Sequence, residues 1–121
     1  MPKRRDSEHL ADARDHLAVL QEHLKRGELS DALVRDAVSH RLEVAIDAVG
    51  RTSPELVESE IGEDWPRIVA MRNILAHQYA ELDQDILRNT VENRLGRFIE
   101  AVERLRRAAA EAETREEKGR E

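Results

Sequence analysis

Apolar residues near the N-terminus recur in alternating steps of three and four, and this spacing restricts the fold more than any other feature of the chain. The repeated positions are Leu10, Ala13, Leu17, Leu20 and Leu24. In an α-helix they form one narrow apolar seam, which suits packing inside a helical bundle. Gly27 is expected to end this helix, after Lys25 and Arg26, whose positive charges suit a helix C-terminus.

Three further helices are expected along the chain. Ser30 is a good N-cap for the second, whose predicted buried face consists of Val34, Ala37, Val38, Ala45, Ile46 and Val49. Asp64 is the expected cap of the third, with Trp65 and Pro66 at its first positions, where proline is tolerated. Asp83 is expected to cap a long fourth helix, whose apolar residues are Leu87, Val91, Leu95, Phe98, Val102, Leu105 and Ala109.

These segments predict an all-α protein, an up-and-down bundle of about four main helices in one domain. A chain of 121 residues is too short for two domains, and no βαβ unit is visible. Residues 51–64 contain Pro54 and Gly62 without sustained periodicity, which predicts a short connecting turn before the third helix. Residues 111–121 lack core-forming side chains and are expected to be a charged, disordered tail, so the predicted domain spans residues 1–110.

Charge and composition limit the classes of function. The formal net charge of −6 disfavours a broad electrostatic grip on nucleic acid, so any such contact must be local. With only Trp65, Tyr79 and Phe98 as aromatic residues, a base-stacking platform is not expected. Cysteine is absent, and no apolar stretch approaches the roughly 20 residues of a membrane span. We therefore expect a cytoplasmic protein without membrane contact.

Three histidines, His9, His16 and His23, repeat every seven residues and raise the question of a metal site. Seven residues rise about 10.5 Å along a helix, which is too far for two imidazoles to share one ion at bond lengths of about 2 Å. The repeat is better explained as a flank of the leucine seam. Neither a metal nor another cofactor is expected.

Arginines along the last predicted helix form a second pattern. They could provide a local basic strip, but solvated arginines paired with Glu92, Glu100 and Glu103 are the favoured interpretation. The arginines are Arg88, Arg94, Arg97, Arg104, Arg106 and Arg107.

The segment 68–80, IVAMRNILAHQYA, carries one charge in a chain that is 38% charged. A helix of this composition is expected to be buried on most sides. At about 100° per residue, Arg72 and Tyr79 fall on one side, while Asn73 and His77 point largely away from it. Either the helix bends or ends near His77, or a second copy of the chain completes the site across a twofold axis, which favours a homodimer.

The polar groups of this segment suit RNA cleavage without a metal. Histidine exchanges protons near neutral pH, so a base could activate a ribose 2′-hydroxyl against the adjacent phosphorus. Arg72 would stabilise the charge on the phosphoryl oxygens. Asn73 could orient the imidazole of His77 or bind the phosphate, and Tyr79 could donate a hydrogen bond. The alternative is structural: Arg72 satisfies carbonyls or an acid, and Tyr79 anchors the bundle.

Arg72, Asn73, His77 and Tyr79 match a pattern of Arg, a polar residue, three apolar or small residues, His, any residue and Tyr. In this the chain resembles HEPN-domain proteins and, more narrowly, HepT-type toxins. The resemblance extends over roughly residues 6–110 in the order of the helices. The chain departs from the family pattern at Trp65 and Pro66, because the family usually has these two residues in the opposite order, Pro-Trp.

The resemblance implies an all-α homodimer in which the Arg and His of both protomers line a cleft. It implies a metal-independent endoribonuclease toxin of a type II/VII-like toxin–antitoxin system, with tRNA among the candidate RNA substrates. Arg72 and His77 would be catalytic, with Asn73 and Tyr79 supporting. A minimal nucleotidyltransferase antitoxin would transfer AMP from ATP to Tyr79 and so disable the toxin. The alternative function is a noncatalytic nucleotide- or phosphate-binding helical subunit of a nucleotidyltransferase.

Overall fold

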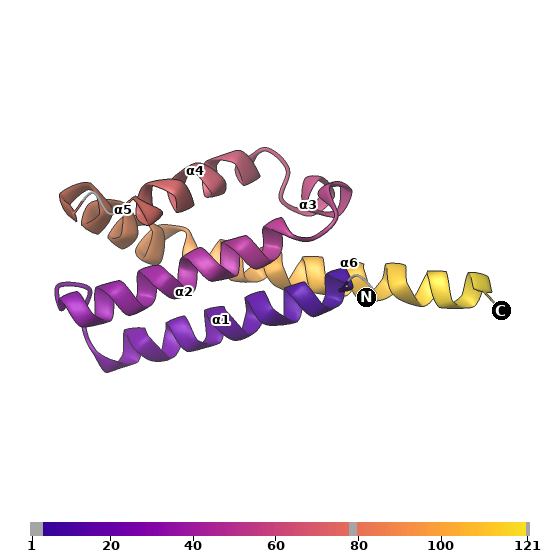
Figure 1. The fold of residues 1–121 in the computed structure, drawn as a ribbon, viewed down its shortest axis with the longest axis horizontal. Coiled ribbons are helices and arrows are strands. Elements are labelled where there is room, and N and C mark those ends of the chain that lie inside the picture. The colour runs from indigo at the N-terminus through magenta and orange to yellow at the C-terminus, as the bar shows by residue number, and fades with distance from the viewer. Residues whose placement is uncertain (1–3, 78–79, 121) are drawn as a thin grey trace.

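The computed structural model describes residues 4–77 and 80–120, and these residues are folded entirely from helices, without a strand (Figure 1). This confirms the all-α prediction. The helices are α1 (Asp6–Arg26), α2 (Ala32–Gly50), α3 (Pro54–Glu60), α4 (Asp64–Ala76), α5 (Ala80–Asn93) and α6 (Leu95–Arg120). None of the helices in the described ranges has both the length and the apolarity needed to cross a membrane.

The core lies where α1, α2 and α6 meet. The predicted seam of α1 is confirmed: Leu10, Ala13, Leu17 and Leu20 are buried, and Leu24 packs partly buried beside them. α2 lies between α1 and α4 (Figure 1) and contributes six buried residues to the core. Further buried side chains come from α6, among them Phe98, Val102 and Leu105.

Two predicted helix starts are wrong by one residue. The N-cap of α2 is Asp31 rather than Ser30, because the Asp31 carboxylate accepts a 2.9 Å hydrogen bond from the backbone N–H of Leu33. Asp64 is the first residue of α4 rather than its cap. Its carboxylate lies 3.4 Å from Arg97 of α6, so a tertiary ion pair takes the place of the expected cap.

The predicted long fourth helix is two helices, α5 and α6. α5 already begins at Ala80, so Asp83 lies inside it and is not its cap. A turn at Arg94 separates α5 from α6, although the N–H of Arg94 still bonds to the carbonyl of Thr90 at 2.9 Å. The apolar spacing continues through this junction, which is why the sequence pattern does not reveal it.

Residues 111–120 continue α6 instead of forming the expected disordered tail. Alanine and glutamate favour helix here, and Ser7 of α1 holds the segment by donating a 2.7 Å hydrogen bond to Glu113. Arg5 adds ion pairs at 3.8 Å to Glu113 and to Glu117. The end of α6 projects beyond the other helices (Figure 1). The domain limits of 1–110 stay a prediction.

The connection before α4, expected to be a short turn, contains the short helix α3. Its N-terminus is fixed to α1, because Asp6 accepts hydrogen bonds from the backbone N–H of Ser53 at 3.2 Å and from its hydroxyl at 2.6 Å. Gly62 then turns the chain into α4 with a φ of 62°, a left-handed conformation that glycine adopts at low cost. This turn sets where α4, and with it the motif, lies on α2.

Candidate functional site

Helix α4 carries most of the motif, and it is far less buried than its composition predicts. Leu75 is its one buried residue, while Ile68 and Met71 pack only partly buried against the core. The expectation that this helix is buried on most sides is therefore wrong. Because α4 rests on α2 with one edge, its flanks border two hollows and its outer face, including Ala70 and Asn73, is exposed.

Arg72 is held by an acid of α2. Its Nε and Nη2 groups each donate a 2.9 Å hydrogen bond to a different carboxylate oxygen of Asp47. The two side chains are 29% and 34% exposed, so the pair lies at the edge of the core. The hydrogen bond to Asp47 raises the pKa of Arg72 against the opposing effect of partial burial, and the charges of Asp47 and Glu43 add to the rise. Arg72 is therefore a fixed cation.

One edge of the Arg72 guanidinium is left for another ligand. Of its five N–H donors, the bonds to Asp47 use Nε–H and one N–H on Nη2, and the other three, two of them on Nη1, have no hydrogen-bond partner among the residues that the structure describes. Arg72 and Asp47 border a hollow of about 430 Å³, whose other lining residues include Arg51, Trp65 and Asn73. Arg51, at the end of α2, brings a second guanidinium to this hollow.

His77 ends α4. Its backbone N–H donates to the carbonyls of Asn73 and Ile74, both at 3.2 Å, and its side chain is exposed. The helix ends near His77, which is one of the two expected alternatives, and the other, a second copy of the chain, stays a prediction. His77 is not among the residues that line the hollow beside Arg72, whereas Asn73 is. Tyr79, the remaining motif residue, lies outside the described residues.

Asp47 was not predicted from the sequence, although a signal for it exists. It is the one charged residue in the segment 44–50, VAIDAVG, just as Arg72 is the one charged residue in the segment 68–80. A lone acid and a lone base, each in an apolar helix, indicate a pair because a buried charge needs a partner. The structural alternative for Arg72, that it pairs with an acid, is therefore observed in its contact with Asp47.

The histidine repeat has no metal-like geometry around it. Nη1 of Arg41 lies 2.9 Å from Nδ1 of His16, which gives this histidine a structural contact between α1 and α2. Within the described ranges, no three His, Asp or Glu side chains gather as they would around an ion.

The arginines of the last two helices form ion pairs as favoured, but with a different set of acids. Arg106 pairs with Glu103 at 3.0 Å, as predicted. Arg97 and Arg104 reach instead to acids of other elements: Arg97 to Asp64 at 3.4 Å, and Arg104 to Glu60 at 3.7 Å. These pairs connect α6 to α3 and α4.

Comparison with known proteins identifies the family. Residues 8–105, most of the chain and all of the motif, match the family described as Ribonuclease HepT-like. No curated protein and no solved structure matches significantly. The family match agrees with the all-helical fold, and the matched range includes the sequence from Arg72 to Tyr79. The chain belongs to the HepT-like ribonuclease family.

Proposed function

We propose that this protein is a metal-independent endoribonuclease and the toxin of a toxin–antitoxin pair. The observation that carries the proposal is the motif of Arg72, Asn73, His77 and Tyr79 in a chain of the HepT-like ribonuclease family. The placement of Arg72 supports it, because Asp47 fixes one edge of the guanidinium and leaves Nη1 free to meet a phosphate. Such cleavage would act on cellular RNA in the cytoplasm.

In the proposed reaction, His77 accepts the proton of a ribose 2′-hydroxyl, and the hydroxyl oxygen bonds to the adjacent phosphorus. The bond from phosphorus to the 5′-oxygen breaks, and that oxygen takes up a proton from a second acid. The products are a 2′,3′-cyclic phosphate and a 5′-hydroxyl. Arg72 stabilises the charge on the phosphoryl oxygens, and exposed Asn73 orients the imidazole or binds the same phosphate.

A homodimer completes this site in our proposal. Within one protomer, His77 does not border the hollow beside Arg72. The exposed face of α4 that ends at His77 carries the small residues Ala70 and Ala76. Small side chains allow two α4 helices to approach closely around a twofold axis. The second acid of the reaction would then be the His77 of the other protomer.

RNA cleavage in EDTA tests the proposal. Wild type is expected to cleave purified cellular RNA, while His77→Ala and Arg72→Ala lose about 10²- to 10⁴-fold in rate. Exposed residues of the same types, His40→Ala and Arg88→Ala, serve as matched controls and should keep the wild-type rate. The proposal fails if folded wild type cleaves no RNA tested, or if the His77 variant cleaves at the wild-type rate.

Subunit mixing tests the composite site. Arg72→Ala and His77→Ala protomers, each inactive alone, should regain a small part of the wild-type cleavage rate after they are unfolded and refolded together. A mixed cleft keeps one Arg72 and one His77 as base, and water takes the place of the missing His77 as the acid. Light scattering should give the mass of a dimer for each protein. A monomer mass with full cleavage activity contradicts the shared cleft.

The antitoxin is proposed to be a minimal nucleotidyltransferase that adenylylates Tyr79. This residue follows His77 by two positions, so a bulky anionic group on it would occupy the site and repel an RNA phosphate. The mass of the protein after co-expression with such an enzyme should rise in AMP-sized increments for wild type and stay unchanged for Tyr79→Phe. Increments that persist in Tyr79→Phe assign the modification to another residue.

A second candidate function is a noncatalytic subunit that binds a nucleotide or phosphate for a nucleotidyltransferase. The bidentate pair between Arg72 and Asp47 and the net charge of −6 favour it, because both reduce the attraction for RNA. This function predicts that wild type binds a nucleotide through Arg72 and leaves RNA intact in the cleavage assay above. Metal-independent cleavage that depends on His77 would exclude it.

A further inference from the structure

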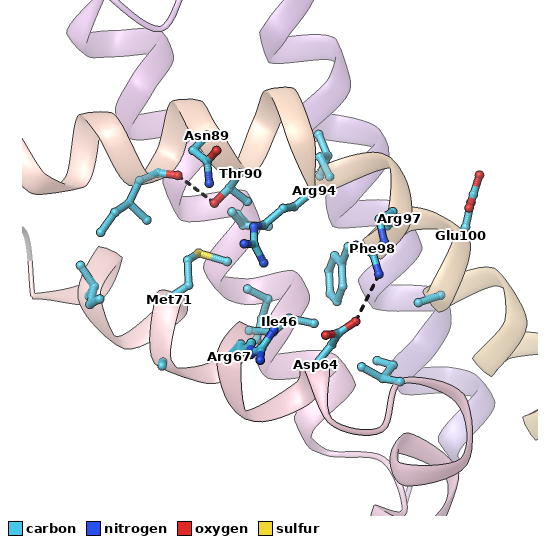
Figure 2. A pocket seen from close by; sticks show the side chains of 18 of the residues that line it. Ile46, Asp64, Arg67, Met71, Asn89, Thr90, Arg94, Arg97, Phe98 and Glu100 are labelled. Carbon is cyan, nitrogen blue, oxygen red and sulfur yellow. Dashed lines mark hydrogen bonds and ion pairs between the residues drawn. The ribbon is translucent and has the colours of Figure 1, made fainter.

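A larger cavity, of about 630 Å³, lies on the other flank of α4, between α4 and the α5–α6 pair (Figure 2). Apolar side chains form much of its walls: Met71 from α4, Ile86 from α5 and Phe98 from α6, with Ile46 of α2 at its base. None of the motif residues from Arg72 to His77 except Ile74 lines it. The ribonuclease proposal therefore leaves this cavity without a role.

Four arginines border the cavity, and two of them are available to a ligand. Arg97 and Arg104 are paired with Asp64 and Glu60. By contrast, the exposed side chains of Arg67 on α4 and Arg94 at the α5–α6 turn form no hydrogen bond or ion pair with any side chain in the described ranges. Arg94 points from its turn toward α4, between Met71 and Phe98 (Figure 2).

Acidic residues are also present at the rim of the cavity. Asp85 and Glu100 both border the cavity. In Figure 2 the carboxylate of Glu100 points away from Arg94. An anion in the cavity could therefore be bound by Arg67 of α4 and Arg94 of the α5–α6 turn.

Two polar side chains of α5 add directional hydrogen-bonding groups. The hydroxyl of Thr90 donates to the carbonyl of Ile86 at 2.8 Å, which leaves its oxygen as an acceptor. Asn89 accepts a 2.8 Å bond from Asn93 at its carbonyl oxygen, which leaves its own NH₂ group as a donor. An apolar cavity with a few convergent polar groups is typical of a small-molecule site.

We propose that this cavity binds one nucleoside phosphate unit. The base lies against the apolar walls and Phe98, Asn89 and Thr90 contact its edge, and the phosphate binds Arg67 and Arg94. The proposal rests on the ribonuclease function in one respect: an RNA strand would supply this nucleotide beside the cleaved bond. A free nucleotide has the same chemistry. An apolar protein helix fits less well, because it would desolvate both arginines without a counter-charge.

Binding of probes that cannot be cleaved tests the site. Fluorescence anisotropy in EDTA measures the Kd of a labelled 2′-O-methyl oligonucleotide, and isothermal titration calorimetry measures the Kd of AMP. Arg67→Ala and Arg94→Ala should each weaken oligonucleotide binding about tenfold. The control is Arg88→Ala, an exposed arginine of α5 that does not border the cavity, and its Kd should stay within about twofold of wild type.

The two probes distinguish the sources of the nucleotide. Oligonucleotide binding that depends on Arg67 and Arg94 supports the site with RNA as its occupant. If AMP binding depends on both arginines and oligonucleotide binding does not, the result supports the site with a free nucleotide as its occupant. The proposal is overturned if neither probe binds, or if both bind equally well to wild type and the two variants. Because no probe is cleaved, a protein that binds through these arginines yet leaves RNA intact refutes the ribonuclease and not this site.

Discussion

Helices α2 and α4 have similar apolar segments in the sequence, but the structure uses them differently. α2 has six buried residues, and together with the seam of α1 it forms the core. α4 has one, Leu75. The apolar side chains of α4 border two hollows instead, and the helix is followed by His77, whose side chain is exposed. An apolar helix therefore does not by itself indicate a core position. It can equally serve a ligand cavity or an interface.

The largest difference between the two helices is expected in their contribution to stability. Leu42→Ala in α2 removes a fully buried side chain and should lower the free energy of unfolding by about 2–5 kcal/mol. Met71 in α4 borders an existing cavity, so Met71→Ala should lower the free energy of unfolding by roughly 1 kcal/mol or less. Urea denaturation measures both values. Equal losses for the two variants would show that α4 belongs to the core after all.

The link between the helices is the ion pair of Asp47 and Arg72. Asp47→Asn should reduce the cleavage rate about tenfold, because Arg72 loses its fixed orientation, and should cost about 1 kcal/mol of stability at this half-exposed site. Substitution of another exposed acid of α2, Asp36→Asn, is the control. A rise in KM with unchanged kcat would indicate that Asp47 affects substrate binding rather than the reaction step.

The pH dependence of this pair follows from the raised pKa of Arg72. A raised pKa means that the stabilisation is fully present below the pKa of arginine in the unfolded chain and is lost as the pH rises through the higher folded value. Both values lie at strongly alkaline pH. From about pH 6 to 10, the stability difference between wild type and Arg72→Ala should therefore be constant, and denaturation at several pH values measures it. A difference that changes within this range would contradict the charged state of Arg72.

A smaller effect is expected at the turn that orients α4. Gly62→Ala places a side chain at a φ of 62° and should cost about 1 kcal/mol. Gly96→Ala is the matched comparison: in α6 a Cβ atom there meets nothing within 4 Å, so it should stabilise the protein by up to about 1 kcal/mol. Thermal denaturation should show a lower Tm for Gly62→Ala and a higher Tm for Gly96→Ala. A neutral Gly62→Ala would mean that the α3–α4 turn relaxes without affecting α4.

Periodicity predicted what depends on local sequence, namely the helices and the seam of α1. It did not predict the break at Arg94, because apolar spacing continues through that turn. It placed the cap of α2 at Ser30 because both Ser30 and Asp31 are good caps, and only the bond to Leu33 distinguishes them. The motif residues were identified from the sequence, whereas the contact of Arg72 with Asp47 joins positions 25 residues apart and depends on how α4 packs on α2.

The products of cleavage test the central claim, metal-independent RNA cleavage through the motif of α4, most directly. A defined oligoribonucleotide is incubated with wild-type protein in EDTA, and mass spectrometry identifies the new ends. We expect a 2′,3′-cyclic phosphate and a 5′-hydroxyl, and no cleavage where the attacking 2′-hydroxyl is replaced by hydrogen. Cleavage that requires added Mg²⁺, that leaves a 5′-phosphate, or that persists at the 2′-deoxy position would contradict the claim.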